Sequence, residues 1–174
     1  MARLKDSMIA YITKDEIARL TTRLAKEISV DYAGKEIILI CPLKGSVCFV
    51  ADLMRKLDVQ QQVDFVHLSG ASKSGTVRIL KDISVNIRDK HVLIVEEIID
   101  AGRTLAFLKE RLMFARPASI KVATLLDKPA RREIHLKPDY IGQTIEDRYV
   151  VGYGMDVAHA FRELRFVGIV KGDV

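Results

Sequence analysis

Short apolar runs separated by stretches of helical periodicity dominate the chain. Residues 36–41 (EIILIC), 63–68 (VDFVHL), 91–96 (HVLIVE) and 120–127 (IKVATLLD) are mainly apolar, a pattern typical of buried strands. Strands that lack a polar face lie in a sheet covered on both sides. The pattern therefore predicts an α/β fold with a mostly parallel, twisted sheet flanked by helices.

Helical periodicity fills the gaps between these runs. The first predicted helix begins after Thr13, because Thr13 and Glu16 have the spacing of a capping box and apolar residues then recur every three or four positions. Further helices are expected at residues 46–58 and 103–114. Each of these two helices connects two apolar runs, so the chain contains two βαβ units.

Shorter elements are expected outside the two units. Residues 42–46 (PLKGS) are expected to form the exit loop of the first strand, and residues 69–76 (SGASKSGT) a flexible loop. The remaining predicted strands lie at 77–80, 140–145, 149–154 and 165–170, with a helical segment at 157–164.

Composition places the chain among ordinary globular proteins. Of its 174 residues, 49% are hydrophobic and 29% charged, which predicts a single domain over residues 1–174. The first ten residues lack the apolar segment of a signal peptide, and no apolar run reaches the roughly 20 residues of a membrane span. Cys41 and Cys48 fit neither a zinc site nor a disulfide framework, and we interpret them as reduced thiols of a cytoplasmic protein.

The net charge of +5 leaves three interpretations open. It is typical of a solvated surface, a nucleic-acid surface or a pocket for a small polyanion. Aromatic residues are few and are not interleaved with basic ones, which disfavours nucleic acid relative to a small anion.

The most informative stretch follows the strand predicted at residues 91–96. Ligands of parallel sheets bind outside the carboxyl ends of the strands, so the loops after residues 41, 96, 127 and 150 are the places to inspect. Glu96, Glu97 and Asp100 stand there beside residues 101–104 (AGRT), which start a helix. A helix start with a glycine suits a phosphate, and nearby carboxylates suit ribose hydroxyls. The alternative is that the three acids only stabilise the helix dipole.

The stretch VLIVEEIIDAGRTL resembles the phosphoribosyl pyrophosphate signature of type I phosphoribosyltransferases. Three further stretches, PLKGSVCFVADL, TLLDKPARR and DRYVVGYGMDVAHAFREL, resemble motifs of the hypoxanthine-guanine phosphoribosyltransferases, in the same order. The resemblance implies the type I fold with a small hood built from chain-terminal segments. It also implies purine salvage: transfer of the 5-phosphoribosyl group from phosphoribosyl pyrophosphate to hypoxanthine or guanine, giving IMP or GMP and pyrophosphate, with Mg²⁺.

The same resemblance implies a role for individual residues. Asp100 would accept the proton of purine N7, and Lys128 would donate to the purine O6. Tyr149 would stack on the base, while Asp156 and Glu96 would bind Mg²⁺. The full set of implied substrate-binding residues is Lys44, Gly45, Glu96, Glu97, Ala101, Gly102, Arg103, Thr104, Lys128, Arg132, Tyr149, Val150 and Arg162.

The chain departs from the family pattern at three places. Glu97 stands where the family usually has Asp, and Ala101 where it has Thr or Ser. The loop at 69–76 is shorter than usual, with Gly70 and Ala71 in place of a Ser-Tyr pair. These departures leave an alternative open, namely a weakly active or non-catalytic homologue that binds purine nucleotides or phosphoribosyl pyrophosphate. The resemblance also implies a homodimer or homotetramer; it does not choose between these, nor between hypoxanthine, guanine and xanthine.

Overall fold

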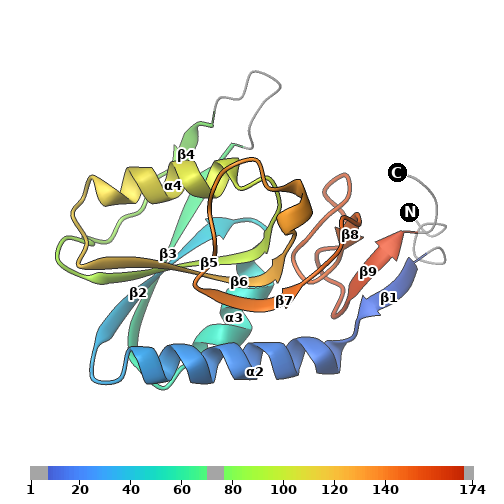
Figure 1. Cartoon of the computed structure of the whole chain (residues 1–174), viewed down its shortest axis with the longest axis horizontal. Helices are drawn as coiled ribbons and strands as arrows, with labels where there is room; N and C mark the ends of the chain where they lie inside the picture. The colour runs from blue at the N-terminus through green and yellow to red at the C-terminus, as the bar shows by residue number, and fades with distance from the viewer. Residues whose placement is uncertain (1–7, 70–76, 171–174) are drawn as a thin grey trace.

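In the part of the chain that the structure describes, six strands form the main sheet, in the order β4-β3-β2-β5-β6-β7 (Figure 1). The computed structural model describes residues 8–69 and 77–170. Within them, all neighbouring strands of this sheet run parallel except β4, which is antiparallel to β3. The mostly parallel sheet expected from the sequence is therefore confirmed. The strands are β2 (Glu36–Leu43), β3 (Gln60–Leu68), β4 (Ile79–Lys81), β5 (His91–Ile99), β6 (Ser119–Asp127) and β7 (Tyr140–Thr144).

Helices cover both faces of this sheet. In Figure 1, α4 (Arg103–Met113) lies on one side of it, and α2 (Lys14–Asp31) and α3 (Val47–Met54) lie on the other. The fully apolar strands account for this arrangement, because successive residues of a strand point to opposite faces. Along β2, Ile37 and Leu39 belong to the core cluster beneath α2 and α3, whereas Ile38 and Ile40 belong to the cluster beneath α4.

The start of α2 follows its sequence signature closely. The Thr13 backbone N–H donates to Glu16 Oε2 at 2.8 Å, and the Glu16 backbone N–H donates to Thr13 Oγ1 at 3.3 Å. Both halves of the capping box are present, which satisfies two backbone donors that the helix itself leaves free. The predicted helix start is confirmed.

A second, smaller sheet joins segments from the two ends of the chain. It consists of β1 (Met8–Ile12), β9 (Val167–Val170) and β8 (Val150–Val151), paired antiparallel. Figure 1 shows this sheet at one end of the molecule, beyond the main sheet. The sequence did not predict β1, because these residues form a strand only through pairing with β9. That the small sheet acts as a hood stays a prediction.

Two strand ends lie further along the chain than expected. β5 does not end at Glu96 but continues to Ile99, because its pairing with β6 continues to Ile99 and Asp127. β2 likewise includes Pro42 and Leu43, which were expected in a loop. A proline is tolerated there because β2 has lost its β5 neighbour after Ile40 and pairs only with β3.

Residues 157–164 do not form the expected helix. Ala158, His159 and Phe161 have φ angles of 49°, 65° and 75°, and such left-handed residues interrupt an α-helix. The segment instead folds back through a bridge between Val157 and Ala160. The Asp156 carboxylate accepts a hydrogen bond from the His159 backbone N–H at 2.8 Å, so a local side-chain bond replaces a helical one.

Both cysteines are free thiols, as the sequence predicted. Cys41 is buried in the core and Cys48 is half-buried, and burial raises the pKa of both thiols. Within the described ranges, no helix is both long and apolar enough to cross a membrane. Of the flexible loop expected at residues 69–76, residues 70–76 lie outside the described part of the chain.

Candidate active site

Two connected pockets lie at the carboxyl ends of β2, β5 and β6. The larger has a volume of about 470 Å³ and the smaller about 220 Å³. Glu97, Asp100 and Arg162 line both pockets, so the two share a border. This is the edge of the sheet at which a parallel α/β fold binds its ligands.

The larger pocket is formed mainly by backbone turns. Residues 42–45, after β2, form one wall, and residues 96–105, from the end of β5 into α4, form another. Gly102 is the N-cap of α4, with a φ of 84° that favours glycine, and it has no side chain to cap the helix. The first turn of α4 therefore offers its backbone N–H groups and the positive end of its dipole to an anion. Ala101, Arg103 and Thr104 belong to this wall.

Close backbone packing fixes the turn at Lys44 and Gly45. A Cβ added to Gly45 would overlap the Glu97 carboxylate, and one added to Gly154 would overlap the Gly45 carbonyl oxygen. Three segments that are distant in sequence thus meet at one point, and glycines are what allow the approach. The exposed side chain of Lys44 lies beside this turn at the pocket wall.

Glu96 and Glu97 form a pair of buried carboxyl groups with few positive charges nearby. Burial raises the pKa of Glu96 well above its usual value, and the neighbouring Glu97 raises it further. Burial also raises the pKa of Glu97, to about 7, although the Arg162 guanidinium acts in the opposite direction. Glu97 Oε2 is buried and has no hydrogen-bond partner among the described residues. An unpaired buried oxygen of this kind is costly unless a ligand or cation contacts it.

Asp156 and Arg162 reach the pockets from the loop before β9. Arg162 pairs with Asp156 Oδ1 at 2.6 Å through one guanidinium nitrogen and donates to the Gly154 carbonyl at 2.6 Å through another. One cationic and one anionic group are therefore brought to the border of the pockets in a defined geometry. The sequence predicted both residues, and the structure brings them together with Glu97.

The smaller pocket is formed by side chains from separate segments. Lys128, at the end of β6, has a side chain that is only 5% exposed. Its ammonium lies 3.2 Å from Asp147 Oδ1 and 3.9 Å from Asp100 Oδ1. Tyr149 and Val150 also line this pocket, and the Tyr149 hydroxyl donates to the Asp156 carbonyl at 3.2 Å.

Two charged residues of this cluster were not predicted from the sequence. The Arg131 Nε lies 3.5 Å from Asp100 Oδ1 and 3.8 Å from Asp147 Oδ1, so two cations and two carboxylates alternate there. Arg131 lies in a single 3₁₀ turn (Pro129–Arg131), and Asp147 in the turn between β7 and β8. The only sequence signal was their position inside stretches that already resembled site motifs.

Arg132 lies outside the lining of both pockets. Its guanidinium donates to the carbonyl of Asp100 at 2.9 Å and to that of Leu136 at 2.5 Å, and it forms a further ion pair with Asp127. These bonds hold the turn after β5 against the segment after β6. Arg132 therefore supports the backbone of Asp100 from behind, and direct contact with a substrate stays a prediction.

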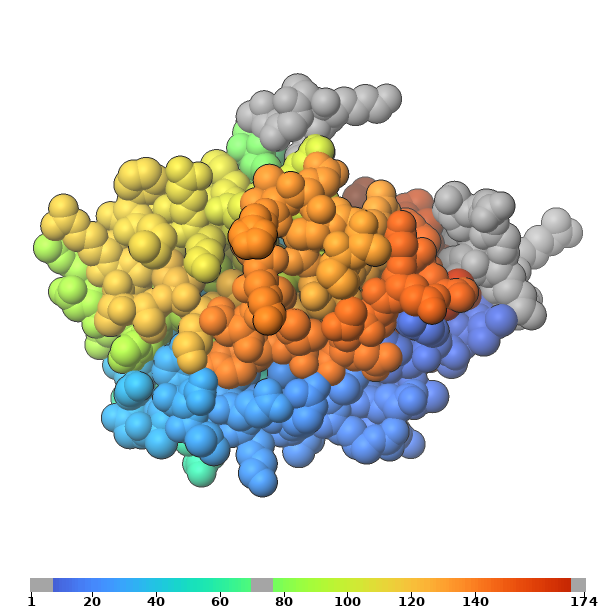
Figure 2. Space-filling view, in the orientation of Figure 1, coloured from blue at the N-terminus to red at the C-terminus, as the bar shows by residue number. Residues whose placement is uncertain are grey.

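The visible surface in Figure 2 reflects this assembly. Residues coloured orange, roughly 130–150, lie across the middle of this face, between the yellow helix α4 and the blue helix α2. On this face the orange residues thus lie beside α4, although β6 separates the two in the chain.

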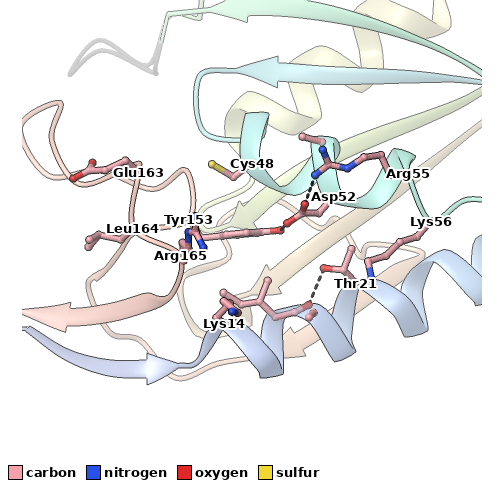
Figure 3. Close-up of a pocket in the computed structure, with 13 residues that line it drawn as sticks. Lys14, Thr21, Cys48, Asp52, Arg55, Lys56, Tyr153, Glu163, Leu164 and Arg165 are labelled. Carbon is pink, nitrogen blue, oxygen red and sulfur yellow. Dashed lines mark hydrogen bonds and ion pairs between the residues drawn. The ribbon is translucent and has the colours of Figure 1, made fainter.

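A third cavity, of about 560 Å³, lies between α2, α3 and residues 163–165 (Figure 3). The buried Tyr153 crosses it, and its hydroxyl donates to Asp52 Oδ2 at 2.6 Å. Arg55 pairs with the other oxygen of Asp52 at 2.5 Å. This contact ties the glycine-rich turn around Gly154 to α3.

Residues 10–158 match the family model of the phosphoribosyl transferase domain. A curated hypoxanthine-guanine phosphoribosyltransferase of Streptococcus pyogenes is 40% identical over 166 residues, which cover 93% of this chain and 92% of the relative.

Solved structures give the same picture. A hypoxanthine-guanine phosphoribosyltransferase of Bacillus anthracis superposes with a TM-score of 0.90 at 42% identity, covering 93% of this chain and 96% of the other. A hypoxanthine phosphoribosyltransferase of Trypanosoma cruzi, in complex with the product IMP, superposes with a TM-score of 0.88 at 37% identity, covering 93% of each chain. On these grounds the chain belongs to the phosphoribosyltransferase family, and within it to the hypoxanthine-guanine phosphoribosyltransferases.

Proposed function

We propose that this protein transfers the 5-phosphoribosyl group from phosphoribosyl pyrophosphate to hypoxanthine or guanine. The products are IMP or GMP and pyrophosphate. The observation that carries the proposal is the common border of the two pockets, where Asp100 stands between an anion-binding helix start and a base-sized pocket. A reaction that joins a phosphorylated sugar to a base needs both pockets to open on one another.

The larger pocket is proposed to bind phosphoribosyl pyrophosphate. The backbone of residues 101–104 would hold the 5′-phosphate, with Arg103 and Thr104 beside it. Lys44, Gly45 and Arg162 would hold the pyrophosphate, which requires Arg162 to exchange its Asp156 partner for the substrate. Glu96 and Glu97 would accept hydrogen bonds from the ribose hydroxyls and stabilise the positive charge that develops on the ribose.

The smaller pocket is proposed to bind the purine. Tyr149 would cover one face of the ring and Val150 would contact its edge, while Lys128 would donate to O6. A donor at this position favours a 6-oxopurine, because the 6-amino group of adenine would oppose it with another donor.

Asp100 is the proposed proton acceptor. Its Oδ1 is buried and accepts no hydrogen bond from the described residues, and its ion-pair partners Arg131 and Lys128 stand 3.5 and 3.9 Å away, so it can still accept a hydrogen bond from a purine N–H. As the bond between purine N9 and ribose C1′ forms and the bond from C1′ to pyrophosphate breaks, the N7 proton passes to Asp100. Removing this proton makes the attacking ring more nucleophilic.

The same site suits Mg²⁺ by the chemistry of its donors. We propose Asp156 and Glu96 as protein ligands, and Glu97 Oε2, which has no hydrogen-bond partner in the described part of the chain, adds a further carboxylate oxygen in the same pocket. No group of three or more His, Cys, Asp or Glu side chains in the described ranges is arranged to hold a metal. Magnesium commonly takes only one or two protein carboxylates and completes its shell with substrate phosphates and water. When bound, it would offset the negative charge of the leaving pyrophosphate.

A pyrophosphate-release assay tests the proposal. Purified protein is mixed with Mg²⁺, phosphoribosyl pyrophosphate and a panel of hypoxanthine, guanine, xanthine and adenine. Release with hypoxanthine or guanine and not with adenine is expected. Absence of release with every purine, together with retained binding of IMP in calorimetry, would instead identify a non-catalytic nucleotide-binding protein.

We further propose that the chain acts as one domain, in the cytoplasm, as a homodimer or homotetramer. The main support is that the family model and the relatives span nearly the whole chain. Sedimentation equilibrium measures the subunit number directly, and a monomer at micromolar concentration would contradict this part of the proposal.

A further inference from the structure

Lys128 is a nearly buried cation with two carboxylate partners. Its side chain is 5% exposed, and an ammonium that is withdrawn from water to this degree needs a compensating charge. Asp147 Oδ1 lies 3.2 Å from the ammonium, closer than Asp100 Oδ1 at 3.9 Å. The nearer partner is therefore the residue to which the family resemblance assigned no role.

The backbone pairing of β7 with β6 brings Asp147 to this position, outside the lining of the pocket. The Ile145 backbone N–H donates to the Asp127 carbonyl at 2.9 Å, and this bond extends the pairing of β7 with β6 past Thr144. Asp147 follows two residues later and lies outside the lining of the purine pocket, which Lys128 and Asp100 line. It can contact Lys128 without contacting a base in the pocket.

The proposed reaction neutralises Asp100, the other carboxylate partner of Lys128. On the proposed mechanism, Asp100 accepts a proton from the purine and becomes neutral as the new bond forms. Lys128 would then be a buried cation without compensation unless a second carboxylate stayed beside it. Arg131, which is 52% exposed, adds another positive charge within 4 Å of Asp100 and Asp147. This second cation increases the requirement for a carboxylate that stays ionised.

We propose that Asp147 is a positioning residue for Lys128. It holds the ammonium toward purine O6 and compensates its charge throughout the reaction, which leaves Asp100 free for N7. This inference rests on the proposed function, and it deepens it by adding a residue that determines how the 6-oxopurine is recognised. Asp147 itself touches no substrate.

The test separates purine recognition from the other steps. In Asp147→Asn, Lys128 loses its nearest counter-ion, so the KM for hypoxanthine should rise about tenfold, the cost of one hydrogen bond to a charged group. The KM for phosphoribosyl pyrophosphate should change less than about twofold, since the larger pocket is untouched. Asp147→Glu, which restores the carboxylate, should recover most of the loss.

The neighbouring Glu146→Gln is the matched control. Glu146 is 75% exposed and pairs with Arg148 at 3.1 Å, so it belongs to the same turn but not to the Lys128 cluster. Both KM values should stay within about twofold of wild type, since exposed pairs of this kind contribute little. Thermal melting of every variant shows whether the turn still folds.

The possible outcomes decide the matter. An unchanged hypoxanthine KM in Asp147→Asn overturns the inference, and so does an equal rise of both KM values. If wild type itself releases no pyrophosphate, the proposed function fails. Calorimetry with IMP then tests Asp147 separately: about tenfold weaker binding in Asp147→Asn supports its role, and equal binding refutes it.

Discussion

The two connected pockets are constructed in different ways. The larger takes most of its wall from two continuous stretches, residues 42–45 and 96–105, and offers mainly backbone groups at turns and at a helix start. The smaller collects Asp100, Lys128, Arg131 and Tyr149 from segments that are far apart in the chain, and offers mainly side chains.

Charge also distinguishes them. At the smaller pocket, Lys128 and Arg131 each face both Asp100, which lines the pocket, and Asp147, which lies outside its lining, so these two cations are compensated before any ligand binds. In the larger pocket Glu96 and Glu97 are neighbours on one strand, and the pKa of each is raised by burial. The difference suggests that the backbone pocket should be sensitive to added atoms and to pH, and the side-chain pocket to the exchange of single groups.

The largest expected effect is a loss of kcat when one carboxylate oxygen of Asp100, at the border of the pockets, is replaced by an amide nitrogen. Asp100→Asn keeps the shape of the side chain but removes the proton acceptor, so kcat should fall by about 10²–10⁴-fold. Stability and IMP affinity should change little. The control is Asp89→Asn, because Asp89 is 87% exposed and asparagine tolerates its φ of 57°. Steady-state kinetics with calorimetry measure both quantities, and a kcat near wild type would remove Asp100 from its role.

The backbone pocket should instead respond to one added methyl group. Gly154 has a φ of 99°, and a Cβ there would overlap the Gly45 carbonyl oxygen, so Gly154→Ala adds overpacking to backbone strain. We expect about 2–4 kcal/mol lower free energy of unfolding, together with weaker binding of phosphoribosyl pyrophosphate.

The matched control for this variant is Gly34→Ala. Gly34 has a φ of 72° but no atom within 4 Å of an added Cβ, so only the backbone cost of about 1–2 kcal/mol remains. Urea unfolding compares the two variants. Equal losses would mean that the close approach of Gly154 to Gly45 contributes nothing to the turn.

The acidic pair should make stability depend on pH. A carboxyl whose pKa is raised in the folded state binds its proton more tightly when folded. For Glu97, whose pKa is raised to about 7, this stabilisation is complete below about pH 4.3, the pKa of an unfolded Glu, and is lost as the pH rises through about 7. Glu97→Gln cannot titrate, so its stability relative to wild type should increase across this window, by at most about 1.4 kcal/mol per pH unit. Melting temperatures from pH 4 to 8 give this difference, and a flat difference would contradict the raised pKa.

The smallest effect on stability is expected at the third cavity, which Tyr153 lines. Tyr153→Phe removes the hydroxyl that donates to Asp52, and Asp52 keeps its pair with Arg55 (Figure 3). The free energy of unfolding should fall by about 0.5–1.5 kcal/mol, the net contribution of one hydrogen bond. Tyr149→Phe, at a ring that is 48% exposed, should leave the stability nearly unchanged. A loss that is equal in the two variants would show that burial of the Tyr153 hydroxyl is not the cause.

Much of the larger pocket could be predicted from the sequence because its parts are local. The strand, the two glutamates, Asp100 and the turn into α4 follow one another within fourteen residues, 91–104. The backbone of such a stretch depends mainly on near neighbours, so residue types and spacing were sufficient. The prediction for this stretch was wrong only about the residue at which β5 ends, because the pairing of β5 with β6 decides that residue.

Other features depended on partners elsewhere in the chain. Asp147 and Arg131 are ordinary charged residues until the turn after β7 meets the end of β6, and Arg132 has its role only because the Asp100 carbonyl lies beside it. Residues 157–164 have a composition that suits a helix, yet the Asp156 carboxylate and three left-handed residues fold them back. No local pattern contains these contacts.

The sequence by itself determined the α/β class, the helix starts and the order of the motifs, because apolar periodicity and capping act over a few residues. The sequence also showed the two residues of the larger pocket that depart from the family pattern, Glu97 and Ala101. Only the tertiary structure decided that Glu97 lies against Gly45 with one oxygen that has no hydrogen-bond partner among the described residues, and that Asp147 compensates the charge of Lys128. The physical reason is that burial and ion pairing depend on which segments meet in space, and that is settled when the sheet and its loops pack together.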